Sequence, residues 1–192
     1  MSIREPGAYP WPTPLRDGTI GPEGWVEGPW DAELRVGRVP VLAVGSNASP
    51  GVLGDKLNAL VGAGRPLVHV EVCRVTHLSV GHSAHLSRTG FVAAAPFRSG
   101  DDAAYSLAWL TPEQVDALDA TEPNYDRLPL PEDCQAHAER TGEVMAAATL
   151  YVSQHGVLGQ RGKPVPLMTQ PQVLAWLRER LTSVDGISDA QL

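Results

Sequence analysis

Two short segments far apart in the chain carry residue types that could do chemistry. The first, Gly45-Ser46-Asn47, follows a short apolar run and is built from residues that tolerate tight turns. Backbone N–H groups in such a turn can point into one concavity and bind a carboxylate or a phosphate. The second contains Glu122, whose carboxylate could transfer protons as a general acid or base. Together they predict an anion cradle and a proton-transfer group.

A strand and a helix are expected to position the first segment. Residues 39–44 are apolar and largely β-branched, which predicts a buried strand that ends at Gly45. Ser49 is a good N-cap, and Pro50 suits the first position of a helix. Apolar residues then recur at helical spacing until Gly62, at Val52, Leu53, Leu57, Leu60 and Val61. The alternative is an ordinary strand-to-helix connection that binds no ligand.

Glu122 is expected at the exit of a short helix. Thr111-Pro112-Glu113-Gln114 has the form of a capping box, so a helix should run from about Pro112 to Thr121. Pro123 disfavours helical geometry at the residue before it, so the helix should end at Glu122. Burial and the negative end of the helix dipole would favour a neutral carboxylic acid there, and Asp119 could add to this effect. The alternative is a solvated acidic helix end.

In this order the two segments resemble the gamma-glutamylcyclotransferase family. The resemblance covers roughly residues 39–153 and includes two strand-like runs, 90–96 and 147–152. It implies an α+β fold, with a small mixed β-sheet or barrel and a few flanking helices. It also implies that Glu122 is the catalytic acid/base and that neither a metal nor a cofactor is needed. The residues implied to bind the substrate are Val44, Gly45, Ser46, Asn47 and Tyr125.

The chemistry implied by the resemblance is the cyclisation of a small-molecule γ-glutamyl amide, which releases 5-oxoproline and an amine. The alternatives are a non-catalytic carboxylate-binding module of the same fold and an amide hydrolase or acyltransferase. Val44 favours the binding module, because the family motif usually opens with an aromatic residue. Pro123 favours it too, because a glycine commonly follows the glutamate. In an enzyme, Glu122 should face the same cavity as the amides of residues 45–47.

Composition limits the other classes of function. The chain has 192 residues, a net charge of −7 and no basic stripe, which argues against a nucleic-acid partner. Two cysteines, Cys73 and Cys134, do not make a disulfide framework and suggest reduced thiols in a cytoplasmic protein. No long apolar stretch predicts a signal peptide or a membrane helix. A homodimer is possible. The scarcity of lysine, present only at Lys56 and Lys163, is interpreted as codon bias.

The rest of the chain is assigned more coarsely. Residues 1–38 are rich in proline and glycine and contain Trp11, Trp25 and Trp30. They are expected to form an extended arm that packs on a domain of residues 39–192. The arm could form one wall of the site. Strands are expected at residues 67–76, 104–110 and 144–152, and a capped helix at 169–181. His77, His82 and His85 lie close together, but a strand would put His82 and His85 on opposite faces, so pocket lining or a structural use is favoured over a metal site.

Overall fold

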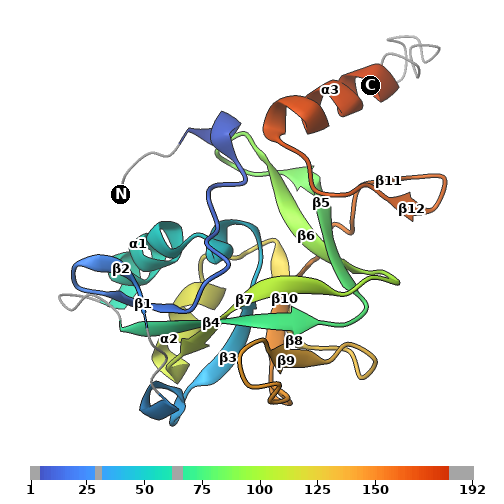
Figure 1. Ribbon diagram of the computed structural model, residues 1–192. Helices are drawn as coiled ribbons and strands as arrows, with labels where there is room; N and C mark the ends of the chain where they lie inside the picture. Colours follow the sequence, from blue (N-terminus) through green and yellow to red (C-terminus); the bar gives the residue numbers. More distant parts are fainter. Residues whose placement is uncertain (1–4, 29–31, 62–66, 182–192) are drawn as a thin grey trace.

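The computed structural model describes residues 5–28, 32–61 and 67–181 as an α+β protein built around one mixed sheet (Figure 1). Along the sheet the strands follow the order β2-β1-β4-β7-β3-β10-β8, and β9 pairs with β4. Neighbours are antiparallel except β10 and β3, which are parallel. The strands are β1 (Gly18–Gly21), β2 (Gly24–Glu27), β3 (Val39–Ala43), β4 (Val68–Val75), β7 (Ala103–Leu110), β8 (Tyr125–Pro129), β9 (Ala136–Ala138) and β10 (Thr149–Ser153).

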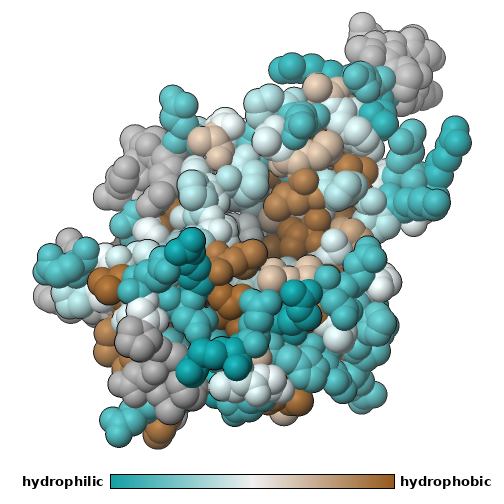
Figure 2. Space-filling view, in the orientation of Figure 1, coloured by the Kyte–Doolittle hydropathy of each residue, from teal (hydrophilic) through white to brown (hydrophobic). Residues whose placement is uncertain are grey.

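The sheet does not close into a barrel within the described residues. Its end strands, β2 and β8, each pair on one side only, so the barrel considered from the sequence is replaced by an open mixed sheet. A separate hairpin of β5 (Leu78–Leu86) and β6 (Val92–Arg98) rises away from it (Figure 1). A third pair, β11 (Gly159–Gln160) and β12 (Lys163–Pro164), lies near the end of the described chain. Figure 2 shows apolar side chains gathered where the β5–β6 hairpin faces the main sheet.

Three α-helices lie in the described residues: α1 (Pro50–Val61), α2 (Pro112–Asp119) and α3 (Gln170–Leu181). Both hydrogen bonds of the capping box at the start of α2 are present, as the sequence predicts: the Thr111 side chain accepts from the Gln114 backbone, and the Gln114 side chain accepts from the Thr111 backbone. Two hydrogen bonds of the Gln170 side chain connect α3 to the β5–β6 hairpin: it accepts from Val92 N at 2.8 Å and donates to Val92 O at 3.0 Å. Three short 3-10 turns complete the list: η1 (Pro6–Ala8), η2 (Ala32–Arg35) and η3 (Gly45–Ala48). No described helix combines the length and apolar character needed to cross a membrane.

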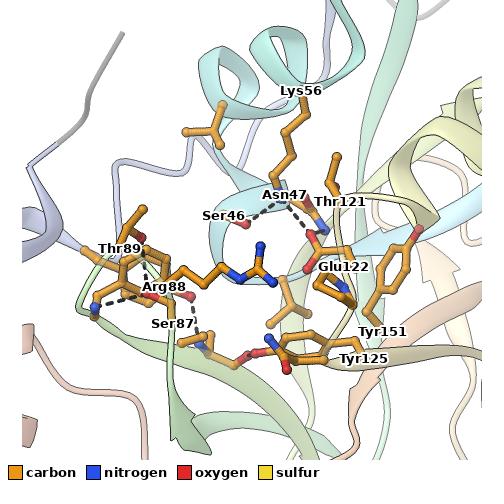
Figure 3. Close-up of a pocket in the computed structure, with 18 of the residues that line it drawn as sticks. Ser46, Asn47, Lys56, Ser87, Arg88, Thr89, Thr121, Glu122, Tyr125 and Tyr151 are labelled. Atoms are coloured by element: carbon orange, nitrogen blue, oxygen red, sulfur yellow. Dashed lines mark hydrogen bonds and ion pairs between the residues drawn. The ribbon is translucent and has the colours of Figure 1, made fainter. Parts of the chain in front are cut away.

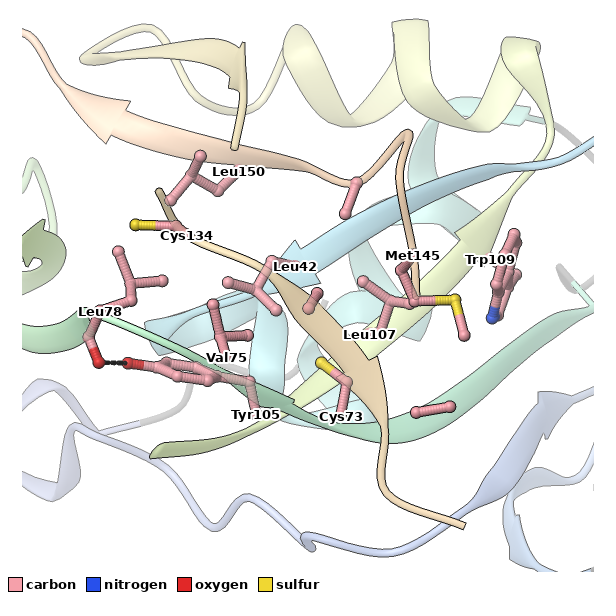
Figure 4. Packing of buried hydrophobic residues seen from close by; sticks show 13 residues of the cluster. Leu42, Cys73, Val75, Leu78, Tyr105, Leu107, Trp109, Cys134, Met145 and Leu150 are labelled. Carbon is pink, nitrogen blue, oxygen red and sulfur yellow. Dashed lines mark hydrogen bonds between the residues drawn. The ribbon is translucent and has the colours of Figure 1, made fainter. Parts of the chain in front are cut away.

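The main sheet separates two apolar clusters, because side chains alternate between the faces of a strand. In β7, Leu107 belongs to one cluster and Ala108 to the other. The first cluster includes Cys73 and Met145 (Figure 4). Helices α1 and α2 cover the other face, where Leu57 is completely buried. Both cysteines are free and buried, and burial raises the pKa of Cys73 to about 12, so its thiol stays protonated at neutral pH.

The expected strands at 67–76 and 104–110 and the helices after Pro50 and Thr169 are confirmed. The expected strand at 144–152 is only half right, since β10 begins at Thr149. Its apolar pattern has another cause: Met145 and Ala148 are buried within a turn, closed by Ala148 N donating to Met145 O at 3.1 Å. The glycines expected to end α1 and the expected packing of Trp30 lie outside the described residues.

Candidate active site

A cavity of about 540 Å³ opens between η3, α1, the tip of the β5–β6 hairpin and the α2–β8 connection. The N-terminal segment also borders it, as it runs from η1 beside the hairpin tip to β1 (Figure 1). Polar groups gather where η3, α1 and the α2–β8 connection meet (Figure 3). The lining includes Tyr9, Trp11, Val44, Ser46, Asn47, Lys56, His85, Arg88, Phe91, Glu122, Tyr125 and Tyr151.

The loop predicted to bind an anion is the 3-10 turn η3. It begins at Gly45, whose φ of 62° lies in the left-handed region that favours glycine. A Cβ at this position would also overlap the Tyr9 hydroxyl, so a side chain is excluded twice. The Asn47 N–H closes the turn by donating to Val44 O at 3.3 Å. The loop therefore presents the Ser46 and Asn47 side chains to the cavity, while Val44 packs at its edge against the first apolar cluster.

A lysine connects this loop to Glu122. Lys56, in the second turn of α1, donates from Nζ to Ser46 Oγ at 2.9 Å, to Asn47 Oδ1 at 2.7 Å and to Glu122 Oε1 at 2.6 Å (Figure 3). Asn47 Nδ2 donates to the same Glu122 oxygen at 3.0 Å. Both charged side chains are largely buried, with 16% and 12% exposed for Lys56 and Glu122. The network thus joins three segments of the chain around one carboxylate.

Glu122 lies just beyond the helix exit. Helix α2 ends at Asp119, and Glu122 is in the tight turn that follows, where its carbonyl accepts from Tyr125 N at 3.0 Å. The Lys56 ammonium group and the Asn47 amide both face Oε1 of its carboxylate. Within the described residues Oε2 accepts no hydrogen bond. One oxygen of Glu122 is therefore fixed, and the other remains for a ligand.

Asp119 does not act on Glu122 as expected, because it has partners of its own. It accepts from Arg127 Nε at 2.9 Å, from Arg127 Nη2 at 3.0 Å and from the Tyr151 hydroxyl at 2.6 Å. Burial opposes the charge of Asp119, but these hydrogen bonds outweigh it and hold the pKa of Asp119 below its ordinary value. Arg127 is thus a structural tie between α2 and β8.

Two tyrosines attach the β5–β6 hairpin to the site. Ala94 N donates to the Tyr9 hydroxyl at 2.7 Å, and the Tyr125 hydroxyl donates to Ala94 O at 2.9 Å. Burial raises the pKa of Tyr9 well above its ordinary value, and burial followed by the charge of Glu122 does the same for the pKa of Tyr125. Both phenols therefore stay protonated at neutral pH.

The three histidines singled out in the sequence have separate surroundings. His85 lines the cavity, where its ring lies 5.8 Å from that of Tyr125 and 4.7 Å from that of His155, and its Nδ1 is 2.6 Å from Ser83 Oγ. His82 is completely buried behind the cavity, and His77 occupies the turn before β5. Burial lowers the pKa of both His82 and His85. In the described part of the chain no three His, Cys, Asp or Glu residues gather as metal ligands.

The structure brings the predicted site residues to one place. Val44, Ser46, Asn47, Glu122 and Tyr125 all line the cavity, and Gly45 lies directly behind it against Tyr9. Sequence reasoning missed the roles of further lining residues: Lys56, Tyr9, Arg88, Phe91 and Tyr151. A signal for the first was present, because a lone lysine interrupts the apolar pattern of α1 in a chain that has only two lysines.

No protein-family model matches this sequence, and no curated protein matches it. Solved structures that align with this chain include three of low sequence identity. A solution structure of an Arabidopsis thaliana protein is 9% identical, covers 78% of this chain and 81% of its own, and gives a TM-score of 0.49. A gamma-glutamyl cyclotransferase (15% identical, TM-score 0.45) and an uncharacterized Homo sapiens protein (16% identical, TM-score 0.46) each align over 62% of this chain and 68% of their own. Likenesses of this degree carry no inference about the activity of this chain.

Proposed function

We propose that this chain cyclises a γ-glutamyl amide, releasing 5-oxoproline and an amine, with Glu122 as the general acid and base. One observation gives the proposal its strongest support. Glu122, Ser46 and Asn47 border the same cavity, and Asn47 Nδ2 lies 3.0 Å from Glu122 Oε1. This arrangement is the one expected of a catalytic carboxylate and not of a structural one, because a proton-transfer group must lie within reach of the bound substrate.

The reaction needs one proton-transfer group. The α-amine of the glutamyl group attacks its own γ-carbonyl carbon, so that a C–N bond forms and a five-membered ring closes. Glu122 accepts the proton that this amine loses, through the oxygen that makes no hydrogen bond within the described residues. It returns the proton to the departing nitrogen as the original amide C–N bond breaks. Holding the amine against the carbonyl supplies much of the remaining acceleration.

Other groups of the cavity position the reactants. Lys56 acts through Glu122 as a positioning residue, because it fixes Oε1 and ties it to the loop. The loop of η3 presents the Ser46 and Asn47 side chains to the cavity, and these would bind the substrate's α-carboxylate or carbonyl oxygen. The Tyr125 hydroxyl already donates to Ala94 O, so Tyr125 contributes a wall to the pocket.

The test is 5-oxoproline release from a panel of γ-glutamyl amides, with wild-type protein, Glu122→Gln and Glu132→Gln. Glu132 is exposed and lies outside the cavity, so its substitution controls for loss of a carboxylate elsewhere. Glu122→Gln should lower kcat by roughly 10²- to 10⁴-fold, as expected for loss of a general acid/base. Equal release by wild type and Glu122→Gln would exclude the assigned role. Release of free glutamate in place of 5-oxoproline would point to the hydrolase considered from the sequence.

A non-catalytic carboxylate-binding module is the second candidate, and the ion pair with Lys56 favours it. The Lys56 ammonium group already occupies one oxygen of the Glu122 carboxylate, as expected of a carboxylate with a binding or structural use. The same panel separates the two, because a binding module would bind γ-glutamyl compounds in calorimetry and release neither 5-oxoproline nor glutamate. Val44 and Pro123 favour this candidate as well, since they depart from the family pattern at the loop and beside the glutamate.

A further inference from the structure

The part of the cavity away from Glu122 is aromatic. The rings of Tyr9 and Phe91 stack with centroids 4.4 Å apart, and the Trp11 ring meets them edge-on at 5.1 and 5.4 Å. Tyr9 is buried, whereas Trp11 and Phe91 are only partly covered and line the cavity. Partly exposed aromatic rings on a cavity wall offer a large apolar contact to a ligand. A glutamyl group bound at the polar end would leave this wall uncovered.

A cation that has no partner among the described residues borders the same cavity. Arg88 lies at the tip of the β5–β6 hairpin, and Figure 3 shows its guanidinium group extended into the space between Ser87 and Glu122. It makes no hydrogen bond or ion pair with the described residues. The other cation of the cavity, Lys56, already donates to three oxygen atoms. Arg88 is therefore the group best placed to bind an anionic part of a ligand.

The backbone of the hairpin tip is closed around Arg88. Ser87 N donates to Phe91 O at 2.8 Å, Gly90 N to Ser87 O at 3.0 Å, and Phe91 N to Ser87 Oγ at 3.1 Å. These bonds close a tight turn that contains the backbone of the exposed Arg88 and ends at Phe91. One short turn thus carries both the arginine and a residue of the aromatic wall.

We infer, on the basis of the proposed function, that the amine released by this chain is an amino acid with an aromatic or large apolar side chain. Its side chain packs against Trp11 and Phe91, and its carboxylate binds the Arg88 guanidinium. An arginine binds a carboxylate through two parallel hydrogen bonds, which gives orientation as well as affinity. The glutamyl end occupies the pole formed by Ser46, Asn47 and Glu122. The ligand then spans the cavity from the loop to the hairpin tip.

Three probes separate the contributions: γ-glutamyl-phenylalanine, γ-glutamyl-phenethylamine, which lacks the second carboxylate, and γ-glutamyl-alanine, which lacks the ring. For wild type, kcat/KM for γ-glutamyl-phenylalanine should exceed that for each of the others about tenfold or more, the effect of one charge-assisted or aromatic contact. Arg88→Gln should abolish the advantage over γ-glutamyl-phenethylamine, and Trp11→Leu the advantage over γ-glutamyl-alanine. Arg161→Gln, at the tip of the β11–β12 hairpin outside the cavity, is the matched control and should keep both ratios.

Binding to Glu122→Gln, measured by calorimetry, gives a readout that does not need turnover. Glu122→Gln should bind γ-glutamyl-phenylalanine more tightly than the other two probes, and the double variant Glu122→Gln/Arg88→Gln should lose this preference. That result would support the inferred binding mode even if wild type released no 5-oxoproline. In that case only the proposed function would fail. Turnover with equal kcat/KM for the three probes would overturn the inference and leave the proposed function intact. A preference that persists unchanged in Arg88→Gln would overturn the role of the arginine.

Discussion

The ion pair between Lys56 and Glu122 should couple the two residues more strongly than a surface pair. Two unit charges 4 Å apart interact by about 1 kcal/mol in water and about 4 kcal/mol at an effective dielectric constant of 20. At the N–O distance of 2.6 Å found here the same formula gives about 1.6 and about 6.4 kcal/mol. The side chains are 16% and 12% exposed, so the pair lies between these limits. Part of the Coulomb energy is offset by the desolvation of both groups. We expect a coupling of about 2 kcal/mol.

A double-mutant cycle measures this coupling without any assumption about activity. Lys56→Met, Glu122→Gln and the double variant would be unfolded in urea and followed by tryptophan fluorescence. Glu122→Gln retains an acceptor for Asn47, so the cycle reports mainly on the charge. The pair Arg74 and Glu139, at 3.4 Å and about half exposed, is the control and should couple by less than about 1 kcal/mol. A coupling for Lys56 and Glu122 no larger than the control value would refute the assigned contact.

Three further predictions concern the groups around the network. Gly45→Ala should destabilise the fold by about 2 kcal/mol, because residue 45 has a left-handed backbone and a Cβ there would overlap the Tyr9 hydroxyl. The loss should be smaller in a Tyr9→Phe background. Urea unfolding measures both, and additive effects of the two substitutions would contradict the prediction. His82 accepts a backbone N–H at 2.8 Å only when neutral, and burial lowers its pKa. The contribution of His82 to the free energy of unfolding should therefore be fully present above about pH 6.5 and should decrease as the pH falls below that value. Thermal denaturation at several pH values should show a smaller decrease for His82→Gln than for wild type. Asp119→Asn should cost about 1–2 kcal/mol at pH 7. Because the pKa of folded Asp119 lies below its ordinary 3.8, this cost should shrink as the pH falls below that value, as urea unfolding at pH 7 and pH 3 would show.

The elements around the site could be predicted because their signals are local. The capping box at Thr111 and the proline at Pro50 each fix the start of a helix through neighbouring residues, and the apolar run at 39–44 fixes a strand. Where the same pattern had another cause, as for the turn before β10, the prediction was half wrong. Apolar periodicity reports burial, and strand geometry is only one way to be buried.

The electrostatics of the site could not be predicted, because the decisive contact is not local. Lys56 and Glu122 are separated by 66 positions, and nothing in either neighbourhood specifies the other. Glu122 alone suggested a carboxylate kept neutral by burial and a helix dipole. The local pattern gave no sign of the ammonium group that lies 2.6 Å from its Oε1.

The N-terminal segment constrains the binding loop although it lies outside the resemblance at residues 39–153. Tyr9 accepts from Ala94 N, 85 positions away, and its hydroxyl fills the space that a side chain at position 45 would need. The glycine of the loop is therefore required by a residue of the N-terminal segment as well as by its own backbone angle. The same tyrosine stacks on Phe91, so it also supports the aromatic wall. A change at Tyr9 should consequently alter both ends of the cavity, the end at η3 through Gly45 and the aromatic end through Phe91.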